Sequence, residues 1–201
     1  MSSYLDPMDQ QALDVKISEL LVATADNYDA ALDRQITDVL VLLRKQLQMD
    51  VVFVSEFVDG ERVFRFVDGG EKHGLNAGDA APLEESYCQR VVEGRMPQLV
   101  SDARELVARG ELFDPGIPVG AHLSTPVVLP DGRVYGTVCC FSASAKPDLQ
   151  QSALACLRQC ARLVARKVDV EPRMEFAPTQ VDWHPTEPAP FPEITGSGES
   201  R

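Results

Sequence analysis

The sequence predicts an α+β fold, in which a central antiparallel β-sheet carries helices on its faces. Two features of the sequence lead to this expectation. It encodes two β-hairpins, separated by a stretch with two short helices and one short strand. Long amphipathic helices precede the first hairpin and follow the second. Hairpins imply antiparallel pairing, and we expect the N- and C-terminal helices to form a bundle.

Two helices are expected before the first hairpin. The first covers residues 6–26, where Asp6 can cap the helix and Pro7 suits its first turn. Its apolar residues recur every three or four positions: Leu13, Ile17, Leu20 and Leu21. The second covers residues 29–48 and has a stripe of the same period. The first stripe has no obvious surface of its own domain to cover, so residues 1–27 are expected to be an N-terminal helix that supports a homodimer.

The hydrophobic period then changes to that of β-strands. Residues 50–57 and 61–68 are rich in β-branched and aromatic side chains, and Asp59-Gly60 between them is a strong two-residue hairpin turn. Four further elements are expected between the hairpins. They are a loop over residues 69–82, a helix over residues 83–94, a strand over residues 97–100 and a helix over residues 101–110. Ser101 or Asp102 would cap the last of these helices.

The second hairpin is expected from residues 120–129 and 133–144, which flank a Pro-Asp-Gly turn. Pro126 cannot donate to a β-ladder, so it indicates a sheet edge or a bulge. A final helix over residues 147–168 has apolar positions that step by three and four. Residues 169–201 are rich in Pro, Glu, Ser and Gly, which predicts a disordered tail.

Three stretches, in this order, resemble the GAF domain family. They are LLRKQLQMDVVFVSEFVDG (42–60), EESYCQRVVEGRMPQLVSDA (84–103) and VGAHLSTPVVLPDGRVYGTVCCFSAS (119–144). The resemblance implies that residues 28–168 form a sensory domain with a ligand pocket under the loops on one sheet face. It also implies terminal helices that pair into dimers, a small-molecule or cofactor ligand, and regulation of a partner signalling protein.

Composition limits the partners of the protein. The 201-residue chain has a formal net charge of −12, which opposes phosphate backbones and anionic lipid surfaces. We therefore expect neither nucleic-acid nor membrane partners. The N-terminal residues lack the pattern of a signal peptide, and no apolar run is long enough for a membrane span. A cytoplasmic protein with mostly reduced cysteines is expected.

Strand alternation and the family resemblance together suggest polar groups for the pocket. The candidates are Tyr87, Asp102, His122, Ser124 and Thr137. Some GAF domains bind haem through a histidine, which makes His122 the best single candidate for an axial ligand. Apart from haem, the sequence indicates no particular cofactor. A covalent bilin is not expected, because no cysteine stands where phytochrome-like domains of the family carry theirs.

The adjacent Cys139 and Cys140 do not predict a metal centre. Neighbouring side chains in a strand point to opposite faces, so these two thiols are expected in different layers of the core. Structural zinc sites use two cysteine pairs, each separated by two to four residues, and the sequence does not offer two such pairs. No metal site is therefore expected.

Cys88 supports an alternative function. One branch of the GAF family reduces free methionine sulfoxide with a cysteine in a similar helix and a nucleophilic cysteine in a later loop. The corresponding loop here, residues 111–122, has no cysteine. The leading expectation is thus a non-enzymatic sensory domain. The alternatives are a thiol-based redox enzyme or sensor that uses Cys88, and a dimerising scaffold whose pocket is vestigial.

Overall fold

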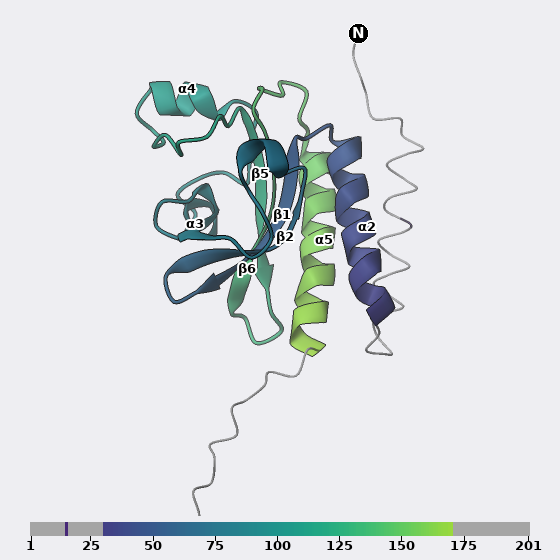
Figure 1. The fold of residues 1–201 in the computed structure, drawn as a ribbon. Helices are drawn as coiled ribbons and strands as arrows, with labels where there is room; N and C mark the ends of the chain where they lie inside the picture. Colours follow the sequence, from purple (N-terminus) through teal and green to yellow (C-terminus); the bar gives the residue numbers. More distant parts are fainter. Residues whose placement is uncertain (1–14, 16–29, 171–201) are drawn as a thin grey trace, which may run out of the picture. The chain divides into compact units, whose positions relative to one another are not determined.

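The computed structural model describes residue 15 and residues 30–170 (Figure 1). Apart from Val15, the expected N-terminal helix lies outside the described residues, as does the segment 171–201 of the expected tail. The described helices are α2 (Ala30–Gln46), the 3-10 turn η1 (Glu71–His73), α3 (Tyr87–Val92), α4 (Ala103–Ala108) and α5 (Gln151–Val170). None of them is long and apolar enough to cross a lipid bilayer.

Six strands form one antiparallel sheet in the order β3-β2-β1-β6-β5-β4. The strands are β1 (Val51–Val58), β2 (Glu61–Asp68), β3 (Ala80–Pro82), β4 (Leu99–Val100), β5 (Ala121–Val128) and β6 (Val134–Ser142). Each long hairpin contributes one strand to the central β1–β6 pair. The expected α+β class and antiparallel sheet are confirmed.

The turn residues act as their chemistry predicts. Asp59 and Gly60 have φ angles of 51° and 80°, so both adopt the left-handed conformation that a tight hairpin turn needs. Pro126 lies beyond the two residues of β5 that pair with β4, and a register shift follows between Val127 and Val128. Proline is tolerated there because no described strand needs its missing N–H on that side.

The sheet separates two layers of the core. Helices α2 and α5 lie side by side on one face, which we call the helical face, and α3 and α4 lie on the other, the loop face (Figure 1). Strand β1 shows the alternation, because Val52 packs in the helical-face cluster and Phe53 in the loop-face cluster. Cys140 and Cys139 divide in the same way between the two faces, as strand alternation predicts.

The largest differences from the expected element boundaries occur in three places. The expected loop 69–82 contains η1 and the short strand β3, which pairs with Glu61–Val63 at the sheet edge. Its Ala-Ala-Pro sequence carries no strand signal, so tertiary pairing decides it. Helix α3 begins at Tyr87, because Ser86 caps it by accepting a hydrogen bond from the Gln89 N–H. Helix α5 begins at Gln151 and continues to Val170.

Candidate functional site

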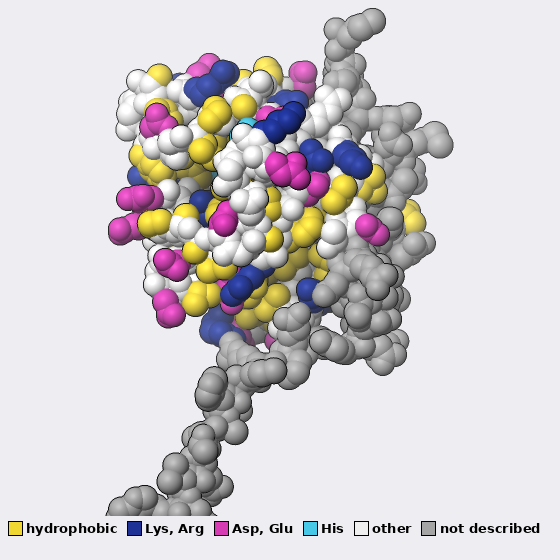
Figure 2. Space-filling model, in the orientation of Figure 1, with side chains coloured by type: hydrophobic (Ala, Val, Ile, Leu, Met, Phe, Trp, Pro, Cys, Tyr) yellow, Lys and Arg dark blue, Asp and Glu magenta, His cyan; other side chains and the backbone are white. Residues whose placement is uncertain are grey.

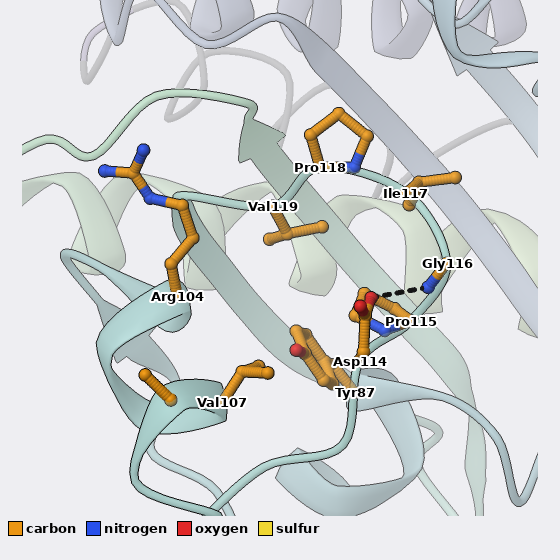
Figure 3. A pocket seen from close by; sticks show the side chains of 10 residues that line it. Tyr87, Arg104, Val107, Asp114, Pro115, Gly116, Ile117, Pro118 and Val119 are labelled. Atoms are coloured by element: carbon orange, nitrogen blue, oxygen red, sulfur yellow. Dashed lines mark hydrogen bonds between the residues drawn. The ribbon is translucent and has the colours of Figure 1, made fainter.

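A pocket of about 410 Å³ lies on the loop face, between α4 and the segment that leads into β5 (Figure 3). One wall is α4, and the other is the segment 114–119. Tyr87 from the start of α3 lies between them. The lining residues are Tyr87, Arg104, Val107, Ala108, Asp114, Pro115, Gly116, Ile117, Pro118 and Val119.

Local chemistry holds the 114–119 wall in shape. Pro115 and Pro118 each fix their backbone φ, which lowers the entropy that the loop loses on folding. Between them Gly116 has a φ of 74°, a conformation that residues with a Cβ rarely adopt. The Asp114 carboxylate accepts a hydrogen bond of 2.9 Å from the Gly116 N–H. The wall is therefore preformed rather than dependent on a ligand.

Tyr87 connects the pocket to the interior. Its hydroxyl donates to the carbonyl oxygen of Phe113 at 2.9 Å, and its ring meets the His122 ring edge to face at a centroid distance of 5.5 Å. Burial, and the nearby charge of Asp114, raise the pKa of Tyr87 to about 12. The hydroxyl thus stays protonated at neutral pH. One side chain lines the pocket and also covers His122.

Arg104 supplies the cationic group of the pocket, and Asp102 holds it in place. The Asp102 carboxylate caps α4 by accepting from the Arg104 N–H and makes a two-pronged ion pair with the Arg104 guanidinium, both contacts at 2.9 Å. This side-chain contact with Arg104 holds the pKa of Asp102 below its usual range. Asp102 does not line the pocket itself, so its role there is to position Arg104.

Beneath Tyr87 lies a buried cluster of three chemistry-bearing side chains, Cys88, His122 and Cys139. The Cys139 Sγ and His122 Nε2 atoms are 3.4 Å apart, and one ligand atom from each of the three residues lies within 4.8 Å of the others. Cys88 and Cys139 are each 1% exposed and His122 is 3% exposed. We call these three residues the Cys-His cluster.

Arg62 completes the surroundings of this cluster. Its Nη1 atom donates to the Cys88 Sγ at 3.5 Å, and its guanidinium lies 4.8 Å from the centre of the Phe64 ring. The Cys139 thiol donates to Cys88 and, together with Arg62 and His122, lowers the pKa of Cys88 well below its usual value. Burial and the neighbouring Cys88 raise the pKa of Cys139 instead. The two thiols therefore hold one readily lost proton and one tightly held proton.

The other two candidates from sequence are buried elsewhere in the sheet. Thr137 shares a 3.0 Å hydroxyl–hydroxyl hydrogen bond with Ser55 on the neighbouring strand. Ser124 is fully buried, and its hydroxyl has no hydrogen-bond partner within the part of the chain that the structure describes. Of the five candidate pocket residues, Tyr87 alone is among the residues that line the described pocket.

The position of His122 does not suit a haem ligand. Its ring lies behind Tyr87 and is not part of the pocket lining. A haem whose iron bonds His122 Nε2 would place its porphyrin in the volume now filled by Cys139 and the start of α3. The residues present therefore do not fit haem in this conformation.

Sequence reasoning missed three contributors to the site. Arg62 and Cys139 reach the cluster from β2 and β6, and Arg104 reaches the pocket from α4. The register of the second hairpin could have indicated that Cys139 lies near His122. It pairs Ser124 with Cys139, so that His122 and Cys139 are diagonal neighbours on one face of the sheet. No comparable local signal joins Cys88 to either residue.

Charged side chains of both signs lie on the described surface. On the face shown in Figure 2, Lys and Arg side chains are interspersed with Asp and Glu side chains and with apolar ones. The ion pairs include Arg65 with Glu56 and Arg133 with Asp131.

Comparison with known proteins gives one family. A family model of the GAF domain matches residues 31–168. The GAF domain of Acinetobacter phosphoenolpyruvate-protein phosphotransferase is similar in structure, with 15% identity and a TM-score of 0.58 over 82% of this chain and 97% of that one. A search of curated protein sequences found no significant match.

Two further similar structures come from proteins with different chemistry. The free methionine-R-sulfoxide reductase of Neisseria meningitidis, solved with its substrate, is 14% identical, with a TM-score of 0.59 over 84% of this chain and 95% of that one. The chromophore-binding domain of Stigmatella aurantiaca bacteriophytochrome is 12% identical, with a TM-score of 0.56 over 85% of this chain and 64% of that one. At these identities the likeness shows the fold alone.

Proposed function

Because the chain belongs to the GAF domain family, we propose that it is a non-enzymatic sensory domain. It binds a small molecule in the pocket beside Tyr87 and signals to a partner protein. The observation that carries this proposal is the preformed pocket on the loop face, whose volume of about 410 Å³ lies within the usual range for small-molecule sites.

The lining indicates the kind of ligand. Val107, Ile117 and Val119 make most of the wall apolar, whereas Arg104 adds a guanidinium and Tyr87 adds an aromatic face. A compact molecule with an apolar body and a polar end matches this arrangement, because the Arg104 guanidinium is already paired with Asp102 and the Asp114 carboxylate lies in the opposite wall. Lack of any such ligand would instead favour a dimerising scaffold with a vestigial pocket.

Strand β5 offers a route from the pocket to the helices. The pocket wall ends at Val119 and the chain passes directly into β5, where His122 faces Tyr87 and Leu123 faces the opposite, helical side. Helix α5 packs on β5 and α2 packs on α5. A ligand that shifts the 114–119 segment would therefore act on the helix pair through one strand.

Filling the pocket should abolish ligand binding. Ala108 is exposed at the rim of the pocket, so an Ala108→Trp side chain can occupy the space with little disturbance of the core. We expect ligands from a metabolite library to raise the Tm of the wild-type protein and to lose at least about tenfold in affinity in the variant. Differential scanning fluorimetry and native mass spectrometry measure both effects.

Val128→Trp is the matched control, because Val128 is half-exposed on β5 and does not line the pocket. It should bind the same ligands as the wild type. Equal affinity of Ala108→Trp and the wild type would refute the pocket as the site, and a library without any binder would favour the scaffold function.

The signalling unit is proposed to be a homodimer in the cytoplasm. The apolar stripe of Leu13, Ile17, Leu20 and Leu21 supports this, and it lies outside the described residues. The test replaces Leu13, Ile17 and Leu20 together by Glu. We expect light scattering at micromolar concentration to show half the wild-type mass, and the circular dichroism of the sheet to stay unchanged. A wild-type protein at monomer mass at every concentration would contradict the dimer.

A thiol-based redox enzyme or sensor is the second candidate function. The observation that favours it is the contact of Cys88 with Arg62 and Cys139, which stabilises a Cys88 thiolate beside a second thiol. The pocket wall holds no cysteine, which argues against a sulfoxide reductase of the usual kind. An assay with methionine sulfoxide and a thioredoxin-type reductant decides between this enzyme and the non-enzymatic sensory domain. Turnover that Cys88→Ser abolishes would establish the enzyme.

A further inference from the structure

We propose that Cys88, His122 and Cys139 form a mononuclear Zn²⁺ site beneath the pocket, separate from the small-molecule site. The three residues come from α3, β5 and β6, and only the folded sheet brings them together. The proposal does not depend on the ligand of the pocket.

The spacing of the donor atoms matches a zinc coordination sphere. Zinc bonds of about 2.3 Å to sulfur and about 2.0–2.1 Å to nitrogen, at a tetrahedral angle, place a sulfur and a nitrogen ligand about 3.5 Å apart. The Cys139 Sγ and His122 Nε2 atoms are 3.4 Å apart. All three donor atoms lie within 4.8 Å of one another, so small side-chain rotations bring each into bonding distance of one ion.

The donor set also selects the metal. Two thiolates and one imidazole suit Zn²⁺, which takes mixed sulfur and nitrogen ligands, whereas Mg²⁺ and Ca²⁺ prefer oxygen. Both cysteines bind zinc as thiolates, and the two thiolates neutralise the dication within an apolar layer formed by Val51, Phe53 and Phe141 among others. A neutral complex is the form that such a layer tolerates.

Three features indicate an exchangeable site rather than a permanent structural one. The cluster supplies three protein ligands, which leaves one position for water or another small ligand. The Nδ1 atom of His122 has no partner among the described residues, so the imidazole lacks the outer hydrogen bond that usually strengthens metal binding. Arg62 also places a positive charge beside Cys88. The affinity should therefore be lower than in four-ligand structural sites.

Helix α3 controls access to the site. It carries Cys88 as a ligand and Tyr87 as the residue that covers His122, and it has only six residues. Local opening of so short a helix exposes all three donors at once. Since Tyr87 also lines the pocket, occupation of the pocket should slow the exchange of the metal.

Cobalt substitution tests the site directly. The full chain is stripped with a chelator, kept reduced with a phosphine and titrated with Co²⁺ and then Zn²⁺ under anaerobic conditions. We expect one ion per chain, a near-ultraviolet sulfur-to-cobalt charge-transfer band, and loss of that band when Zn²⁺ displaces Co²⁺. In Cys88→Ala or Cys139→Ala the band should fall to about half or less.

Cys140→Ala is the matched control, because Cys140 is the next residue on the same strand, is equally buried and faces the helical side. It removes the same sulfur from the core and should leave the cobalt spectrum unchanged. His122→Phe keeps a ring against Tyr87 while removing the nitrogen ligand, and it should shift the visible cobalt bands. Circular dichroism shows that each variant is folded.

Two results would overturn the proposal. One is a folded, reduced wild-type protein that binds no stoichiometric Zn²⁺ in mass spectrometry or chelator competition. The other is a cobalt spectrum that is the same in the wild type and in Cys139→Ala. A Cys88–Cys139 disulfide that forms in air while the reduced protein binds no metal would assign the cluster to thiol redox chemistry instead.

Discussion

Gly136→Val should prevent stable folding. A Cβ at Gly136 would lie 1.9 Å from the Ser55 carbonyl oxygen, 2.7 Å from the Ser55 carbonyl carbon and 2.9 Å from the Glu56 Cα. All three are backbone atoms of β1, so rotation of a side chain cannot relieve the overlap. Strands β1 and β6 would have to separate at the centre of the sheet, and we expect a loss of more than about 4 kcal/mol in the free energy of unfolding.

Chemical denaturation followed by circular dichroism measures this loss. Val134→Ala, two residues earlier on β6 and partly exposed, should change the unfolding free energy by less than about 1 kcal/mol. The Ser55–Thr137 hydroxyl pair lies beside the overlap and should break with it. A Gly136→Val protein within 1 kcal/mol of the wild type would show that the two central strands are not held this closely.

The fold could be predicted from local signals because each hairpin is encoded by neighbouring residues. Asp59-Gly60 supplies the positive φ angles of the first turn, and the alternation in β1 and β6 assigns their side chains to the two faces. Strand β3 could not be predicted in this way. Ala80 and Ala81 have no strand propensity of their own, and they pair because β2 presents an open edge.

The candidate site was less predictable, for a physical reason. Tyr87 and His122 were identified from strand alternation and family resemblance, but the pocket itself depends on how α4 and the 114–119 segment pack. The Cys-His cluster requires three elements distant in sequence to meet on one sheet face. Metal patterns in sequence depend on short spacings, and residues 88, 122 and 139 have none.

Leu157→Ala should destabilise the protein by about 3–4 kcal/mol, within the range for fully buried leucines. Leu157 lies in the middle of α5, has 0% exposure and belongs to the cluster on the helical face. Truncation leaves a cavity between α5 and the sheet that the close-packed surroundings can fill only in part. The free energy of unfolding from urea titration is the measurement. Arg162→Ala, exposed on the same helix, is the control and should cost less than about 1 kcal/mol.

The same variant also measures how the two faces communicate. Leu157 is separated from the pocket by the thickness of the sheet, because it packs with Leu123 and Cys140 rather than with the loop-face residues. If β5 only anchors the helices, folded Leu157→Ala protein should bind the pocket ligand with wild-type affinity. If β5 transmits the signal, the affinity should change, because loosened packing of α5 shifts the balance between two arrangements of the strand. We expect a change of about fivefold or more, since coupling free energies of 1 kcal/mol or above correspond to at least that factor. An unchanged affinity would place the signalling route outside β5.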